Sequence, residues 1–317
     1  MSAAWRILGS ILFATILKAQ PQTDLLRAAQ SPYDLAKYAE SHDQIDWSPL
    51  WAAWKINEPT HLRPCGTDPT NRCAAEILAL VNPNQTILLL QSSELTFHDI
   101  YLRYRQQQDG SWSFAGEYHA FIKQFPRRHE VVRLWNKPFL KVSHDESQIG
   151  AGYTQEVEEW FDLTQPDFEP VFSFTVQGSE QRFSMGVGRS LNALAIPLVQ
   201  NPEEIILDLN VTFLGSGLEL PANYSGTYSR KPGEKKFTLR SASVDPTRTA
   251  LATGAFEALA GIFELTNEQL LVYALPGLRK IATSTNPEDK EWLKQVLEEA
   301  KDTPEKRELE KLLAPKR

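Results

Sequence analysis

The sequence predicts an α+β protein with a large antiparallel β domain, an N-terminal helical segment and a C-terminal helical subdomain. From about residue 75 to residue 244, short apolar runs alternate with polar residues and are separated by turn residues, which is typical of antiparallel strands. Helix-start signals, a capping residue followed by proline, precede and follow this region. About 10–12 strands without intervening helices form either a sandwich or an open, barrel-like sheet. The chain has no fixed repeat period, which disfavours a propeller.

The first residues have the layout of a secretory signal peptide, predicted over residues 1–19. Arg6 is followed by an apolar run over residues 7–17 and by Ala19, after which the chain turns polar. The run is too short to cross a hydrocarbon core of about 30 Å as a helix. No cysteine follows it directly, so we expect no lipid anchor there. We therefore expect cleavage after Ala19 or Gln20, a secreted or periplasmic location, and no transmembrane segment in the mature chain.

The remaining chain divides by pattern into three regions. Residues 20–60 are predicted to be an N-terminal helical segment, residues 61–245 the antiparallel β domain, and residues 246–317 the C-terminal helical region. With 42% hydrophobic residues, the chain can bury a substantial core. Its formal net charge of -7 makes nucleic acids and anionic lipids poor partners, because both attract patches of lysine and arginine.

Two helices are predicted in the N-terminal segment. Ser31-Pro32 and Ser48-Pro49 each place a capping residue before a proline that suits the first helical turn. Trp47, Trp51 and Trp54 follow i, i+4, i+7 spacing and form one aromatic stripe. The stripe either packs this segment on the main body or forms an exposed platform for a sugar or peptide, with Trp51 and Trp54 as the binding residues.

The β domain begins with two cysteines in a loop rich in proline, glycine and aspartate. In an oxidising compartment Cys65 and Cys73 are expected to form a disulfide. Their spacing is not that of a redox-active C-x-x-C pair. A metal site would need two further ligands, and only His61 is near in sequence, so we predict no metal site.

Period-two alternation and turn residues define the predicted strands. Asp109-Gly110 marks a tight turn, and the sequence Lys-Pro-Gly-Glu over residues 231–234 suits a type II turn. The predicted strands are 77–81, 86–91, 98–107, 112–122, 130–135, 139–144, 153–162, 170–177, 182–188, 194–199, 205–213, 224–229 and 235–241.

Several capped helices are predicted after residue 246. Residues 266–269 form a capping box, and Pro276-Gly277 stops or kinks the helix that it opens. Asn286-Pro287 and Thr303-Pro304 open two further helices with interspersed charges, which indicates a solvated helical hairpin with one apolar face. The alternative is a helical surface that docks a partner subunit through an exposed stripe including Leu309 and Leu312.

The densest group of carboxylates lies on the predicted strand 153–162. Alternation places Glu156, Glu158 and Trp160 on one face. Two carboxylates and an aromatic residue on one sheet face are components of a glycoside hydrolase, which needs an acid and a nucleophile or base. The alternative is an ordinary solvent face of a sheet.

Glu117 and His119 share one face of the predicted strand 112–122. If both point inward, they form a candidate acid–base pair; if both point outward, they form a surface pair. His144 at a strand end is a weaker candidate of the same kind. The sequence has neither an H-E-x-x-H nor a G-x-S-x-G motif.

No motif after residue 20 specifies a reaction. The sequence therefore favours an exported soluble protein that is not a catalyst but a binding or structural protein of the cell envelope or extracellular space. Its partner would be a protein or a glycan, with no nucleic acid and no cofactor. The alternative is a secreted carbohydrate-active hydrolase that uses Glu156 and Glu158, with His119 and Glu117 as further candidates.

Overall fold

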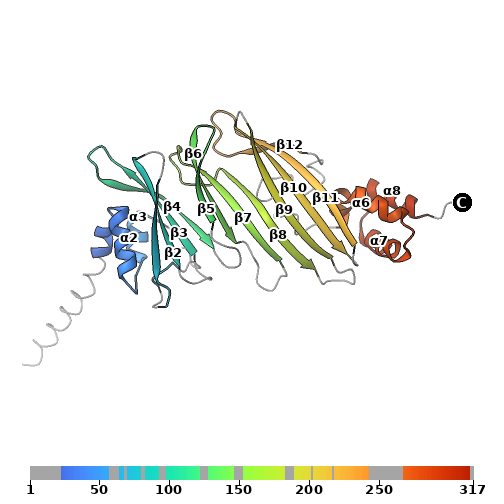
Figure 1. Ribbon diagram of the computed structural model, residues 1–317, viewed down its shortest axis with the longest axis horizontal. Coiled ribbons are helices and arrows are strands. Elements are labelled where there is room, and N and C mark those ends of the chain that lie inside the picture. Colours follow the sequence, from blue (N-terminus) through green and yellow to red (C-terminus); the bar gives the residue numbers. More distant parts are fainter. Residues whose placement is uncertain are drawn as a thin grey trace, which may run out of the picture. The chain divides into compact units, whose positions relative to one another are not determined.

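The computed structural model describes residues 23–56, 64–67, 70–79, 83–92, 98–121, 128–145, 153–182, 189–200, 203–215, 218–242 and 267–314. The predicted signal peptide and the capping residue Thr266 lie outside these ranges. The described residues confirm the predicted α+β class: antiparallel sheets are preceded and followed by helices (Figure 1). Within them, no helix is both long and apolar enough to cross a membrane.

The chain forms two compact units. The first contains residues 1–132 and 162–169, and the second contains residues 133–161 and 170–317. The division therefore falls inside the region 61–245, which we predicted as one β domain. Alternating polarity identifies strands but does not show which strands share a sheet.

The first unit combines a four-stranded sheet with helices (Figure 1). Its strands follow one another in the order β1-β2-β3-β4, each antiparallel to the next. Helix α2 packs against β1 and β2. The elements are α2 (Pro32–Ser41), α3 (Ser48–Trp54), β1 (Cys73–Ala79), β2 (Gln85–Ser92), β3 (His98–Gln106) and β4 (Trp112–Phe121).

The two N-terminal helices begin in different ways. The Ser31 Oγ accepts a hydrogen bond from the Asp34 backbone N–H at 3.4 Å, so Ser31 caps α2 as predicted. The expected cap at Ser48 is wrong by one residue, because Ser48 is the first residue of α3 and Trp47 is its N-cap. The Asp46 carboxylate instead accepts from the Ser48 N–H at 3.1 Å and from its hydroxyl at 2.7 Å. The aspartate two residues upstream therefore supplies the acceptor.

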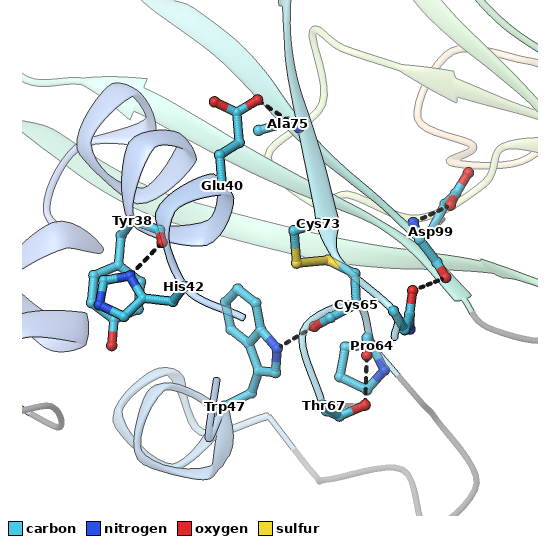
Figure 2. Close-up of a disulfide and its surroundings, with 12 residues drawn as sticks. Tyr38, Glu40, His42, Trp47, Pro64, Cys65, Thr67, Cys73, Ala75 and Asp99 are labelled. Carbon is cyan, nitrogen blue, oxygen red and sulfur yellow. Dashed lines mark hydrogen bonds between the residues drawn. A yellow bond between two sulfur atoms is a disulfide. The ribbon is translucent and has the colours of Figure 1, made fainter. Parts of the chain in front are cut away.

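The predicted aromatic stripe forms and lies in the core of the first unit. The Trp47 and Trp51 ring centroids are 5.8 Å apart, and those of Trp51 and Trp54 are 6.3 Å apart. The Trp47 Nε1–H donates to the Cys65 carbonyl at 2.8 Å, as Figure 2 shows. The core residues come from both helices, the disulfide loop and the sheet: Leu35, Ala39, Trp47, Leu50, Trp51, Cys65, Leu88, Leu90, Ile100, Leu102 and Tyr104.

The Cys65–Cys73 disulfide is confirmed, and it joins the loop to the start of β1 (Figure 2). Both sulfur-bearing residues are buried beside Trp47. Closing a loop of this length removes chain entropy from the unfolded state. The crosslink therefore holds the entry to β1 against the helices.

Replacing both cysteines by alanine is expected to lower the free energy of unfolding of the first unit by about 2.5 kcal/mol, the chain-entropy value for a loop this short. Urea unfolding, followed by amide hydrogen exchange in β2 and β3, would measure the loss. Wild-type protein under reducing conditions is the control and should match the variant. An unchanged midpoint would show that the crosslink adds nothing to stability.

Residues Asp162–Glu169, which we call the strap, lie against the second face of the small sheet at Arg103 and Gly116. The Arg103 side chain is fully buried and donates to the carbonyls of Leu163 at 2.5 Å and Gln165 at 2.9 Å. It also donates to the Gln85 side-chain oxygen at 2.7 Å. The buried guanidinium therefore donates hydrogen bonds to carbonyl groups of the strap that are not paired with a neighbouring strand.

Glycine is required opposite this arginine. Gly116, the register partner of Arg103 on β4, has φ +140°. A Cβ atom at this position would lie 2.8 Å from the Cβ of Phe168 in the strap. The missing side chain therefore allows the strap to approach the sheet.

The second unit is built on an antiparallel sheet with the order β12-β11-β10-β9-β8-β7-β6-β5, an up-and-down meander (Figure 1). Its strands are β6 (Lys137–Asp145), β7 (Tyr153–Asp162), β8 (Phe172–Arg182), β9 (Arg189–Gln200), β10 (Glu204–Gly215), β11 (Leu218–Ser229) and β12 (Thr238–Ala242). The edge strand β5 (Arg128–Leu134) belongs to the same sheet, but its residues 128–132 are part of the first unit.

Strands β9, β10 and β11 are longer than the sequence predicted. Each has 12 residues, and the extra length of β9 and β11 contains Asn192 and Asn223, which interrupt the apolar pattern. Asn210 of β10 pairs with Asn223 of β11, so pairing continues through these positions. Ladder hydrogen bonds join backbone groups and do not depend on side-chain polarity. The strand predicted over 182–188 is not described as a separate element, because β8 extends to Arg182 and residues 183–188 lie outside the described residues.

Aromatic side chains fill the core of the second unit. The Trp160 ring lies 5.4 Å from that of Phe172, and the Phe172 ring lies 5.3 Å from that of Tyr228. Ile205 and Leu207 of β10 are buried as well. One face of the large sheet therefore carries this core.

The C-terminal helices confirm the predicted starts at Asn286 and Thr303, whose side chains accept from the N–H groups of Glu288 and Lys306. Helices α5 and α6 contact β11. Leu309 is buried and Leu312 is 39% exposed, so the exposed stripe required for subunit docking does not include Leu309. The helices are α5 (Asn267–Tyr273), α6 (Leu275–Thr283), α7 (Pro287–Glu299) and α8 (Pro304–Leu313).

Candidate functional site

Glu117 and His119 lie on the face of the small sheet that the helices cover. Glu117 pairs with Leu102, and His119 pairs with Ile100; both partners belong to the core beneath the helices. The His119 ring lies 6.1 Å from the ring of Trp51. Of the two arrangements that the sequence left open, the structure therefore has the inward one.

The environment of this pair opposes acid–base chemistry. Burial, assisted by nearby His98, lowers the pKa of His119 to about 4. Burial raises the pKa of Glu117, and a backbone hydrogen bond opposes this change. Within the described residues, neither ring nitrogen of His119 has a hydrogen-bond partner. A general base needs a pKa near the working pH and a positioned partner, whereas His119 has a lowered pKa and no hydrogen-bond partner among the described residues.

The tryptophans proposed as an exposed platform are packing residues. Trp51 is only 4% exposed. The half-buried Trp54 stacks on Phe114 of β4, with ring centroids 4.0 Å apart and ring planes within 2°. The two indoles thus attach α3 to the sheet, and Trp51 is inaccessible to a ligand.

Glu156 and Glu158 belong to β7 of the second unit, whereas Glu117 and His119 belong to the first. Glu156 is fully buried and accepts from the Gln177 amide at 2.8 Å. Glu158 accepts from the Trp160 indole N–H at 2.6 Å, so these two residues share a face as predicted.

The pairing of β7 with β8 shifts register between Glu156 and Val157. This bulge interrupts the regular alternation from which we placed both glutamates beside each other. The two carboxylates are therefore held by different partners, an amide and an indole. A glycosidase instead needs one acid and one nucleophile or base that face the same bond.

Another histidine cluster lies across β6, β7 and β8. The His144 Nε2 is 3.6 Å from Glu159 Oε2, and the Ser173 hydroxyl donates to Glu159 Oε1 at 2.9 Å. In an activated nucleophile the serine contacts the histidine. Here Ser173 donates to the Glu159 carboxylate instead, as in a hydrogen-bond network that holds neighbouring strands together.

The sequence analysis did not predict an exposed apolar surface that lies on β9 and β10. Ile196 and Leu198 of β9 are each 47% exposed, and the register places Leu198 beside the half-buried Ile206 of β10. We call Ile196, Leu198 and Ile206 the β9–β10 patch. On β10 the neighbouring residues Ile205 and Leu207 are buried in the aromatic core, so the patch lies on the opposite face of the sheet, which is open at Ile196 and Leu198.

A sequence signal for this patch existed. Residues 193–199 read Ala-Leu-Ala-Ile-Pro-Leu-Val, an apolar run without alternation. Such a run predicts a strand whose two faces are both apolar, which normally means that both are covered. Here the second face is exposed at Ile196 and Leu198.

No group of three histidine, cysteine, aspartate or glutamate side chains in the described part of the chain could hold a metal ion. No protein-family model matches the chain, and neither a curated protein nor a solved structure matches it.

Proposed function

We propose that this protein is an exported, non-catalytic binding protein that contacts its partner through the β9–β10 patch. The observation that carries the proposal is the exposure of Ile196 and Leu198 on the open face of a sheet. Exposed aliphatic side chains that adjoin one another lower the free energy of association when a partner covers them. The aliphatic character of the patch favours a protein over a glycan, since sugars stack on aromatic planes.

Two further observations support the proposal. The candidate catalytic carboxylates Glu156 and Glu158 are held by separate local partners, which disfavours the hydrolase alternative. The signal-peptide layout of residues 1–19 supports export, and the Cys65–Cys73 disulfide is compatible with an oxidising compartment.

Exchanging Ile196 and Leu198 for threonine is expected to abolish most of the fluorescence gain that the neutral apolar dye N-phenyl-1-naphthylamine shows with the wild type. Threonine is β-branched and therefore suits a strand, but it has less apolar area than isoleucine or leucine. A dye titration of both proteins is the measurement, with circular dichroism to verify the fold.

The matched control replaces two exposed leucines outside the patch, Leu26 and Leu312, by glutamine. This variant should bind the dye like the wild type. If the control variant loses as much dye binding as the threonine variant, or if the threonine variant binds normally, the patch is not the binding surface.

A further inference from the structure

We infer that the β9–β10 patch receives a cationic, amphipathic polypeptide segment, in which apolar side chains are flanked by lysine or arginine. The inference rests on the proposed function and specifies the partner's chemistry. It follows from the carboxylates that border the patch and from the lack of cations paired with them in the part of the chain that the structure describes.

The carboxylates lie on both sides of Ile206. Glu204, Ile206 and Asp208 alternate along β10 and therefore share the open face. The register places Glu204 opposite Gln200, and Asp208 opposite the exposed Ile196. Residues two apart on a strand are about 6.5–7 Å apart, so the two acids bracket the patch at about 13 Å.

These two acids are not neutralised by the described part of the protein. There, neither Glu204 nor Asp208 forms an ion pair or a side-chain hydrogen bond, and both are only half-buried. Arg240 of β12 donates to the hydroxyl of Ser229, the residue opposite Glu204, and is paired with Glu234. Lys137 and Arg230 are both paired with Glu203. The patch therefore has a negative border.

The neighbouring strand supplies no opposing charge. Ser229 and Ser225 of β11 lie opposite Glu204 and Asp208, so a hydroxyl residue pairs with each acid across the sheet. A negative border attracts basic groups and repels acidic ones, and complementary charge selects the partner and speeds its association. A second copy of this chain, with its net charge of -7, fits this border poorly.

The size of the patch favours a polypeptide over a small cation. Apolar side chains on two strands, with acids about 13 Å apart, match a segment that presents apolar residues between two basic ones. A small cation would meet the carboxylates but leave Ile196 and Leu198 exposed.

Two synthetic 14-residue peptides test the inference, one composed of leucine and lysine and one in which glutamate replaces each lysine. Fluorescence anisotropy at low and high salt would give their affinities for the full mature chain. The lysine peptide is expected to bind at least about tenfold more tightly, with an affinity that falls as salt screens the carboxylates.

The charge of the border is tested by the double variant Glu204→Gln, Asp208→Asn. It should bind the lysine peptide about fivefold more weakly, as expected for two exposed ion pairs, and should bind the neutral dye like the wild type. The control Glu169→Gln, Glu298→Gln removes two exposed acids elsewhere and should leave peptide affinity unchanged.

The outcomes separate the two proposals. Equal binding of both peptides, or normal lysine-peptide binding by the border variant, would overturn the inference of a cationic partner while dye binding still supports an apolar binding surface. If neither the peptides nor the dye bind, the proposed function itself fails.

Discussion

Replacing Arg103 by methionine is expected to lower the free energy of unfolding of the first unit by about 3–5 kcal/mol. Methionine retains much of the apolar stem but leaves the buried carbonyl of Leu163 without its donor, and the carbonyl of Gln165 with Arg105 as its remaining donor. Burial, with a smaller contribution from Arg105, lowers the Arg103 pKa to about 10, and Asp162 opposes this change. The guanidinium is thus still protonated at pH 7, and the lost hydrogen bonds are charge-assisted.

Amide hydrogen exchange of β2 and β3 in increasing urea measures this effect, because those amides report on the first unit alone. The matched control is Arg105→Met, which removes hydrogen bonds to the carbonyls of Gln165 and Pro166 from a half-buried side chain. This control variant should lower the free energy of unfolding by only about 1 kcal/mol. Equal losses in the two variants would show that the burial of Arg103 has no special role.

Lowering the pH from 7 to 4 is expected to lower the free energy of unfolding of the first unit by about 3 kcal/mol through the protonation of His119 alone. The ordinary histidine pKa is 6.5, and burial lowers that of His119 to about 4. Between these two values the unfolded chain binds a proton that the folded unit does not. The contribution of neutral His119 is therefore complete above pH 6.5 and is lost as the pH falls towards 4.

Two other groups act near the same position. Glu117 has a raised pKa, so its contribution has the opposite sign: the folded unit takes up a proton more readily as the pH falls. His98 adds to the lowered pKa of His119, because protonation of both rings brings like charges together. The wild-type pH profile alone therefore does not isolate His119.

The variant His119→Leu isolates the effect, because leucine fills the apolar space beside Trp51 and does not titrate. Its stability should fall less than that of the wild type between pH 6.5 and 4, by about 3 kcal/mol. Urea unfolding at several pH values, again followed by amide hydrogen exchange in β2 and β3, gives the slope of unfolding free energy against pH for the wild type and for the variant. Parallel slopes would mean that His119 is protonated as easily in the folded unit as in the unfolded chain.

The candidate site was only partly predictable from the sequence. The pattern correctly placed Glu117 with His119 on one strand and Glu158 with Trp160 on one face, because side chains alternate along a strand. It left open which face was covered. The burial of His119 depends on Trp51, 68 residues earlier in the chain, and period-two alternation contains no information about such a contact.

The sequence by itself determined the features that depend on neighbouring residues. These are the capped helix starts at Ser31, Asn286 and Thr303, most strands of the two sheets, and the short disulfide loop. Each depends on residues close in sequence. The tertiary structure alone decided that Arg103 binds a strap about 60 residues later. It alone left Ile196 and Leu198 uncovered. Both outcomes depend on which distant segments of the chain come into contact. The pattern of apolar residues indicates that a side chain tends to be buried, but it does not indicate which segment covers that side chain.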